Sequence, residues 1–278
     1  MMTLGKFEIS VHNHGFLGLD GGAMFGAVPK SIWSSLIPAD EENRIRLATR
    51  SLLVWADDRV FMVDAGNGDK LTDKFRRIFT IEGPAPGEPA LDSAAVTDII
   101  ITHLHFDHAG GMSRFASSGS REVELCYPAA RVYVQADNVE TGRRPNPRER
   151  ASYLKEDVQA VERSRLELTR GTREIAPGIW VHQGNGHTRG LQWVEVKDGG
   201  KTIAYPSDMI PTSRHLPLPY MMGYDMCVET LLVEKEDFLR RAVENDWLVV
   251  FEHDPDIPAA RLKVDDRGRF SVREIVRI

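Results

Sequence analysis

The stretch from residue 103 to residue 108 constrains the fold of this chain more than any other. Its sequence, His-Leu-His-Phe-Asp-His, places three histidines and one aspartate within six positions. It follows the β-branched run 99–101, which is typical of a short strand buried on both faces. Open α/β sheets carry their functional sites on the loops that leave the carboxyl ends of such strands. The stretch therefore predicts a metal-binding loop at the edge of a central sheet.

The spacing of these side chains suggests how they would divide between ions. Alternate side chains of an extended segment share one side, so His103 and His105 can face one ion together. Asp107 and His108 follow after the chain has begun to turn, and they can point to a second position. The motif alone is compatible with one ion or with two.

Composition limits the class of protein. A chain of 278 residues with 42% hydrophobic residues can bury one substantial core, and we expect a single domain over residues 1–278. The formal net charge of −6 argues against nucleic acid or an anionic membrane as the main partner, because both require a cationic face. The two cysteines are too few for a disulfide framework, and neither a leader pattern nor a membrane-spanning apolar run is present. We expect a soluble cytoplasmic protein.

Hydrophobic periodicity predicts strands and helices along the whole chain. The expected strands cover 6–12, 47–55, 59–63, 99–101, 130–135, 179–183, 192–196, 201–205 and 247–251, with a hairpin after 261. The expected helices cover 70–79 and 91–96 and begin again at 112, and a charged helical insertion covers 136–170. The glycine-rich segment 15–29 is expected to be a loop that packs on the core or lines a pocket.

Four more polar side chains stand where predicted strands end, at Asp64, His187, Asp208 and His253. Taken alone, each has an ordinary explanation. An aspartate before glycines is often only a turn former, and a single histidine in a glycine-rich loop is more often structural than a ligand. They become candidates for one site only through a resemblance to a known family.

Together these residues resemble the metallo-β-lactamase-fold hydrolases. The stretch 103–108 is similar to the signature of that family, and 186–190, Gly-His-Thr-Arg-Gly, fits its Gly-His-Thr-x-Gly pattern. Ser207-Asp208 stands where members usually have Gly-Asp. The matching elements span roughly residues 7–254. The resemblance implies an α/β fold of the metallo-β-lactamase type, a four-layered αβ/βα sandwich.

The resemblance also implies a dinuclear site in which every ligand position is filled. The ligands would be His103, His105 and His187 for one ion, Asp107, His108 and His253 for the other, and Asp208 bridging both. Asp64 matches a family aspartate that supports the metal-binding loop through hydrogen bonds. The donors are nitrogen and oxygen without thiolate, which suits two Zn²⁺ ions and also Mn²⁺, Fe²⁺ or Co²⁺.

The implied reaction is hydrolysis by a hydroxide that bridges the two ions, whose charge lowers the pKa of water from about 15.7 to about 7. Such a hydroxide would open a lactone or cleave a carboxylic ester. One example of such a lactone is an acyl-homoserine lactone, whose hydrolysis is the reaction of quorum quenching. Asp107 is the candidate for taking or shuttling the proton, with Asp208 holding both ions. Two alternatives stay open: a phosphotriester hydrolase that uses the same site, and, from a different class, a diiron redox or sensor module.

Two segments, 20–26 and 211–226, resemble the branch of acyl-homoserine lactonases and methyl-parathion-type hydrolases, and both are expected to shape the substrate pocket. Related lactonases carry a tyrosine shortly after the bridging aspartate, where this chain has 209–211, Met-Ile-Pro. The candidates for substrate contact are Met24, Phe25, Phe106, His215, Tyr220 and Tyr224, and the last three are the stand-ins for that tyrosine. The expected partner is a neutral, partly hydrophobic small molecule, and a homodimer is compatible with the sequence.

Overall fold

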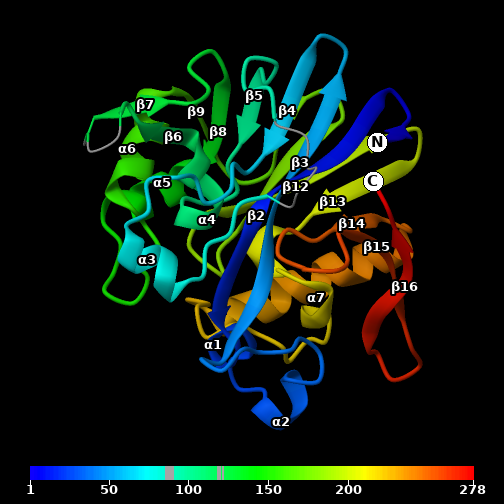
Figure 1. Cartoon of the computed structure of the whole chain (residues 1–278). Coiled ribbons are helices and arrows are strands. Elements are labelled where there is room, and N and C mark those ends of the chain that lie inside the picture. The colour runs from blue at the N-terminus through cyan, green and yellow to red at the C-terminus, as the bar shows by residue number, and fades with distance from the viewer. Residues whose placement is uncertain (85–90, 118–119, 121) are drawn as a thin grey trace.

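A computed structural model describes residues 1–84, 91–117, 120 and 122–278. Two seven-stranded sheets pack face to face, and helices lie against the outer face of each (Figure 1). The layers therefore run helix, sheet, sheet, helix. This order confirms the predicted four-layered αβ/βα sandwich.

The first sheet leads into the predicted metal-binding loop. In spatial order its strands are β1 (Met2–Leu4), β2 (Phe7–Asp20), β3 (Arg44–Ala56), β4 (Arg59–Val63), β5 (Asp98–Ile100), β8 (Arg131–Gln135) and β9 (Arg165–Thr169). The pairs from β1 to β4 are antiparallel, and those from β4 to β9 are parallel. The carboxyl ends of four strands consequently meet at one edge of this sheet.

The second sheet is antiparallel except for one pair. In spatial order its strands are β10 (Arg173–Ala176), β11 (Ile179–Gly184), β12 (Leu191–Asp198), β13 (Lys201–Tyr205), β14 (Leu248–Val250), β15 (Ala259–Val264) and β16 (Phe270–Val276). The parallel pair is β13 with β14. A small separate ribbon is formed by β6 (Ser113–Phe115) and β7 (Val123–Leu125).

The helices cover the outer faces and close the ends of the sandwich (Figure 1). They are α1 (Gly21–Phe25), α2 (Lys30–Trp33), α3 (Asp73–Ile78), α4 (Phe106–Ala109), α5 (Ala136–Arg143), α6 (Lys155–Arg163) and α7 (Val228–Glu244), with short 3-10 turns at Gly110–Met112, Ser207–Met209 and Ser213–His215. Residues of α5 and α6 pack on the first sheet, and residues of α7 pack on the second. None of the described helices is both long and apolar enough to cross a membrane.

Strand β5 is buried on both faces, as the β-branched run predicted. Ile100 belongs to the apolar cluster between the two sheets, whereas Ile99 and Ile101 belong to the cluster beneath α5 and α6. All three side chains are fully buried. Because both faces are packed, the strand holds the start of the metal-binding loop in a fixed position.

The N-terminal glycine-rich segment differs from its prediction. Residues 15–20 continue β2 and pair with β3, and Gly21–Phe25 forms α1, so the predicted loop was wrong for this part. The physical reason is a bulge between Asn13 and Gly15, where the glycine takes a φ of +136° that other residues rarely adopt. The strand can therefore bend and continue to the site.

Three other predictions of local structure were also wrong. Residues 91–96 form a turn, in which the Asp92 carboxylate accepts the Ala94 N–H at 3.0 Å, and residues 113–115 form β6 instead of a helix. The segment 136–170 is not a solvated insertion, because β9 completes the first sheet and α5 and α6 cover that sheet. The predicted strands are all present, and 70–79 contains α3.

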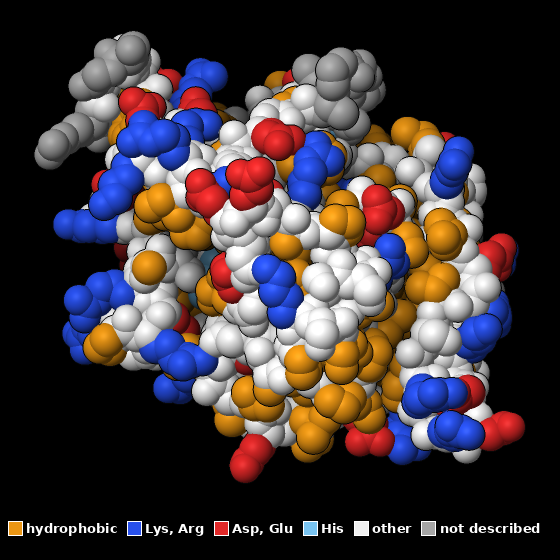
Figure 2. Space-filling model, turned by 60° about the horizontal axis from the view of Figure 1, so that its bottom comes forward, with side chains coloured by type: hydrophobic (Ala, Val, Ile, Leu, Met, Phe, Trp, Pro, Cys, Tyr) orange, Lys and Arg blue, Asp and Glu red, His pale blue; other side chains and the backbone are white. Residues whose placement is uncertain are grey.

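Hydrophobic side chains gather on the face of the molecule that carries α1 and α2 (Figure 2). Ile32 of α2 is 47% exposed there. Beneath the surface, Met24 of α1 is almost fully buried and reaches a cavity that is described below. The N-terminal segment thus contributes an apolar wall to the functional end of the sandwich.

Candidate metal centre

The metal-binding loop turns from extended chain to helix at the place that the spacing predicted. His105 is still extended, with φ of −68° and ψ of 155°, and α4 begins at the next residue. Asp107 and His108 therefore lie on a helical turn. The change in backbone direction separates the first two histidines of the motif from its last two polar residues.

Seven side chains converge at the edge where this loop meets loops of the second sheet. The first group comprises His103, His105, His187 and Asp208, and the second comprises Asp107, His108 and His253. Within each group the donor atoms lie within 4.8 Å of one another, and all seven side chains are buried. The structure thus brings together every residue that the sequence proposed as a ligand.

Asp208 lies between the two groups. One carboxylate oxygen is 3.3 Å from His187 Nε2, and the other is 3.1 Å from His253 Nε2. Burial acts to raise the pKa of Asp208, but the nearby His253, His108 and His187 outweigh it and hold that pKa well below its usual value. Asp208 is therefore an ionised carboxylate shared by both groups, which is the arrangement of a bridging ligand.

The donor atoms of the first group fit a metal ion. His103 Nε2 and His187 Nε2 lie 2.9 and 3.3 Å from His105 Nδ1, so three ring nitrogens point at one space. Burial and the neighbouring histidines hold the pKa values of His103 and His105 well below normal, so both rings are neutral. The Asp208 Oδ2 atom lies 3.8 Å from His103 Nε2 and 3.3 Å from His187 Nε2. Imidazole nitrogens that converge beside an ionised carboxylate oxygen are the donor set that a divalent cation binds.

Asp64 supports the loop in the position that the sequence proposed. Its carboxylate accepts the backbone N–H and the hydroxyl of Thr102, each at 2.7 Å, and lies 3.0 Å from His108 Nδ1. Its φ is +60°, a conformation that non-glycine residues rarely adopt. The three hydrogen bonds offset the cost of this backbone geometry.

Three further contacts orient the histidine rings, and the sequence analysis singled out none of them. His187 Nδ1 lies 2.9 Å from the Asp225 carboxylate, and the His253 Nδ1–H donates to the Ala48 carbonyl at 2.7 Å. The Glu252 carboxylate lies 3.0 Å from His108 Nδ1. Each contact engages Nδ1, so the Nε2 lone pair of each ring is left for the metal centre. Asp225 and Ala48 are distant in sequence from their histidines, and only tertiary packing brings them together.

A cavity of about 260 Å³ opens over the two groups. Its floor carries five of the candidate ligands, and its walls are largely apolar. The ligands are His105, Asp107, His187, Asp208 and His253, and the wall includes Leu19, Met24, Phe79, Phe106, Met222 and Tyr224. The cavity is small and apolar except at its floor and along the segment 148–152.

Three of the six residues proposed for substrate contact line this cavity, namely Met24, Phe106 and Tyr224. Phe25, His215 and Tyr220 lie behind the wall instead. Phe25 is fully buried and stacks on His215, with ring centroids 4.6 Å apart, and His215 Nε2 donates to the Met24 carbonyl at 2.9 Å. These three residues therefore support the wall from behind.

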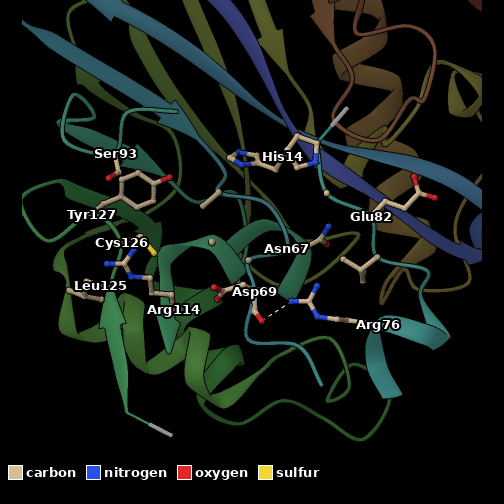
Figure 3. Close-up of a pocket in the computed structure, with 16 residues that line it drawn as sticks. His14, Asn67, Asp69, Arg76, Glu82, Ser93, Arg114, Leu125, Cys126 and Tyr127 are labelled. Carbon is tan, nitrogen blue, oxygen red and sulfur yellow. Dashed lines mark hydrogen bonds between the residues drawn. The ribbon is translucent and has the colours of Figure 1, made fainter. Parts of the chain in front are cut away.

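A larger cavity, of about 520 Å³, lies on another side of the metal-binding loop (Figure 3). His14, Asn67, Arg76 and Tyr127 are among the residues that line it. It contains none of the seven candidate ligands, and its two arginines are accompanied by Asp69 and Glu82. The smaller cavity is therefore the candidate active site, because only that one reaches the metal-binding side chains.

Comparison with known proteins gives a consistent result. A family model described as the Metallo-beta-lactamase superfamily matches residues 44–231. A probable metal-dependent hydrolase from Staphylococcus aureus superposes with a TM-score of 0.86 at 27% identity, over 99% of this chain and 100% of that one. For AidC, a dizinc quorum-quenching lactonase, the TM-score is 0.79 at 18% identity, over 100% and 97% of the two chains. The hydrolase AbOPH superposes with a TM-score of 0.75 at 19% identity, over 100% of this chain and 96% of that one. No curated protein matches the sequence.

Proposed function

This chain belongs to the metallo-beta-lactamase superfamily and is a metal-dependent hydrolase, and we propose that it opens lactones or cleaves carboxylic esters. One observation supports the proposal most directly. Asp208, shared by two groups of buried histidines, lies at the floor of a cavity whose walls are mostly apolar. That combination suits a small substrate with a carbonyl group and an apolar part.

The ligand roles follow the two groups of side chains. We assign His103, His105 and His187 to one ion, and Asp107, His108 and His253 to the other, with Asp208 shared. Two divalent ions held there would supply an activated water and polarise the substrate oxygen. We propose zinc for both because the donors are nitrogen and oxygen, and because the similar protein AidC is described as a dizinc enzyme.

Asp107 is the residue that we propose for handling the proton. Its carboxylate lines the cavity and lies 3.8 Å from the Nε2 atoms of both His108 and His253. A carboxylate in that position can accept a proton from the attacking water and return it to the leaving alkoxide. Replacement by asparagine keeps the shape of the side chain and removes this capacity.

Tyr224 is the residue that we propose for binding the substrate oxygen. Of the three stand-ins considered from the sequence, it is the one that lines the cavity. Burial raises its pKa to about 12, so its hydroxyl keeps a proton at neutral pH and can donate a hydrogen bond. The nearby carboxylates of Asp20 and Asp107 also raise the pKa of Tyr224.

A substrate panel with metal analysis tests the proposal. The purified protein would be assayed with an acyl-homoserine lactone, simple lactones, aryl esters and a phosphotriester, before and after chelation, and its metal content would be measured by plasma mass spectrometry. Lactone or ester turnover that is lost on chelation and restored by zinc is the expected result. Phosphotriester turnover alone would favour the alternative hydrolase, and bound iron without any hydrolysis would favour a redox or sensor module.

A cytoplasmic location is also part of the proposal. Both cysteines are free thiols, with Cys126 partly buried and Cys227 exposed. Free thiols suit a reducing compartment. Fractionation of the native host cells, with detection by an antibody against this chain, would test the assignment.

A further inference from the structure

One cationic side chain lines the candidate active-site cavity away from its histidine floor. Arg148 lies on the segment 148–152, which lines the cavity together with apolar side chains such as those of Met24 and Phe106. In the part of the chain that the structure describes, no carboxylate lies within 4.0 Å of its guanidinium. The cavity thus presents an arginine without an ion-pair partner.

The contacts of Arg148 hold it in place without neutralising it. Its guanidinium donates to the backbone carbonyl of Gly223, which also lines the cavity. Its backbone N–H donates to the Asn146 side chain at 2.9 Å. A guanidinium has five N–H donors, so one hydrogen bond to a carbonyl leaves most of them free.

The adjacent glutamate does not serve as its counter-charge. Glu149 is 7% exposed, and its two carboxylate oxygens accept from Asn146 Nδ2 at 2.7 Å and from the Thr188 hydroxyl at 2.9 Å. These bonds direct its carboxylate toward the histidine loop at 187 and away from ion-pair contact with Arg148. The other acidic residues of the cavity are the candidate metal ligands Asp107 and Asp208, whose charge bound ions would offset.

We infer that Arg148 determines specificity for a substrate that carries a carboxylate at the end of an apolar chain, remote from the reacting carbonyl. This inference rests on the proposed esterase or lactonase function and names the substrate class of that site. The apolar walls would hold the chain, and the free donors of the guanidinium would bind the terminal carboxylate, for which their planar geometry is suited. This substrate class differs from the neutral, partly hydrophobic molecule that the sequence led us to expect.

A matched pair of esters tests this inference. Para-nitrophenyl hexanoate and mono-para-nitrophenyl adipate have acyl chains of equal length. The hexanoate chain ends in a methyl group, and the adipate chain ends in a carboxylate. The measured quantity is the ratio of kcat/KM for the adipate to kcat/KM for the hexanoate, with zinc-loaded protein. We expect a ratio of about 5 at low ionic strength, the effect of one exposed ion pair, and a decrease as salt is added.

Three variants separate charge from structure. R148Q keeps a neutral amide donor and R148M removes every side-chain donor, and in both variants the ratio of kcat/KM values should fall to about 1. R148K keeps the positive charge, so its ratio of kcat/KM values should stay close to that of the wild type. The matched control is R150Q, which removes an exposed arginine two positions away that does not line the cavity, and its ratio should equal that of the wild type.

The outcomes distinguish this inference from the function on which it rests. If neither ester is hydrolysed and no lactone is opened by zinc-loaded protein, the proposed function fails. If both esters are hydrolysed with a wild-type ratio near 1 or below, or if R150Q lowers the ratio as much as R148Q does, the role of Arg148 is overturned and the function stands.

Discussion

The side chain of Asn138 accepts the backbone N–H of Leu104 at 2.8 Å, between the first two histidines of the metal-binding loop. Its amide nitrogen donates to the Arg189 carbonyl at 3.0 Å, two residues after His187. One fully buried amide on α5 therefore joins the two loops that supply the first group of metal ligands. Neither loop contributes a complete group alone, and Asn138 helps to hold the two loops together.

Replacing Asn138 with alanine should weaken metal binding. The change leaves the buried Leu104 N–H without a partner, at a cost of about 1–3 kcal/mol, and removes the donor to the Arg189 carbonyl. We expect the affinity for zinc to fall about 10–100-fold, as for other residues that orient ligands. Competition with a chromophoric chelator measures this affinity. The control is Asn245→Ala, an exposed asparagine at the end of α7, and equal affinities of the two variants would contradict the role of Asn138.

Replacing Asp208 with alanine should abolish the effect of metal on stability. A ligand that binds the folded chain alone stabilises it by about 4 kcal/mol at a thousandfold excess over its Kd. Asp208 contacts both histidine groups, so its loss removes the carboxylate shared by both ions. Thermal denaturation with and without zinc should show a large rise in Tm for the wild type and little change for the variant. A variant that binds two ions per chain and keeps the same rise would disprove the shared role.

Lys235 should make stability depend on pH. This fully buried residue of α7 donates to the carbonyls of Pro217 and Tyr220, at 2.9 and 2.8 Å. Burial lowers its pKa to about 7, although the Asp225 carboxylate acts in the opposite direction. In the unfolded chain its pKa is about 10.4. Between these two values the unfolded state binds a proton that the folded state lacks, so stability rises with pH.

The test compares the wild type with Lys235→Met by urea denaturation across this pH range. Methionine cannot bind the proton, so the free energy of unfolding of the wild type should rise relative to the variant, by at most about 1.4 kcal/mol per pH unit. Below the folded-state pKa the difference should be constant. The exposed Lys263→Met variant is the control and should follow the wild type. Parallel curves for the wild type and Lys235→Met would show that Lys235 is not the titrating group.

The sequence was sufficient to propose the ligand set because its motifs resemble those of a known family, and each ligand outside the stretch 103–108 lies shortly after a predicted strand. His187 follows β11, Asp208 follows β13 and His253 follows β14, and the ends of these strands lie near the end of β5. A strand is recognised from its own residues, and the packing of two sheets then brings the strand ends together. The four-layered architecture could be expected only from the resemblance to a known family, because periodicity predicts strands and helices but not how they are layered.

The residues that orient the ligands could not be found in this way. Asn138 and Asp225 are separated from their partners by 34 and 38 positions, and no local pattern connects them. The segment 136–170 was predicted as solvated because it is rich in charge, yet α5 directs Asn138, Val139 and Gly142 inward. A short buried face among many charged residues gives little periodic signal.

Tyr224 provides the sharpest test of substrate binding. If its hydroxyl holds the developing oxyanion, Tyr224→Phe should lower kcat for a lactone or ester by about 100-fold, the usual effect of removing one such donor, with a smaller change in KM. The matched control is Tyr220→Phe, the same change in the same loop at a residue that packs against Phe25 and does not line the cavity. A decrease of similar size in both variants would point to disturbance of the loop. A decrease confined to Tyr224→Phe would show that the hydroxyl acts on the reacting oxygen.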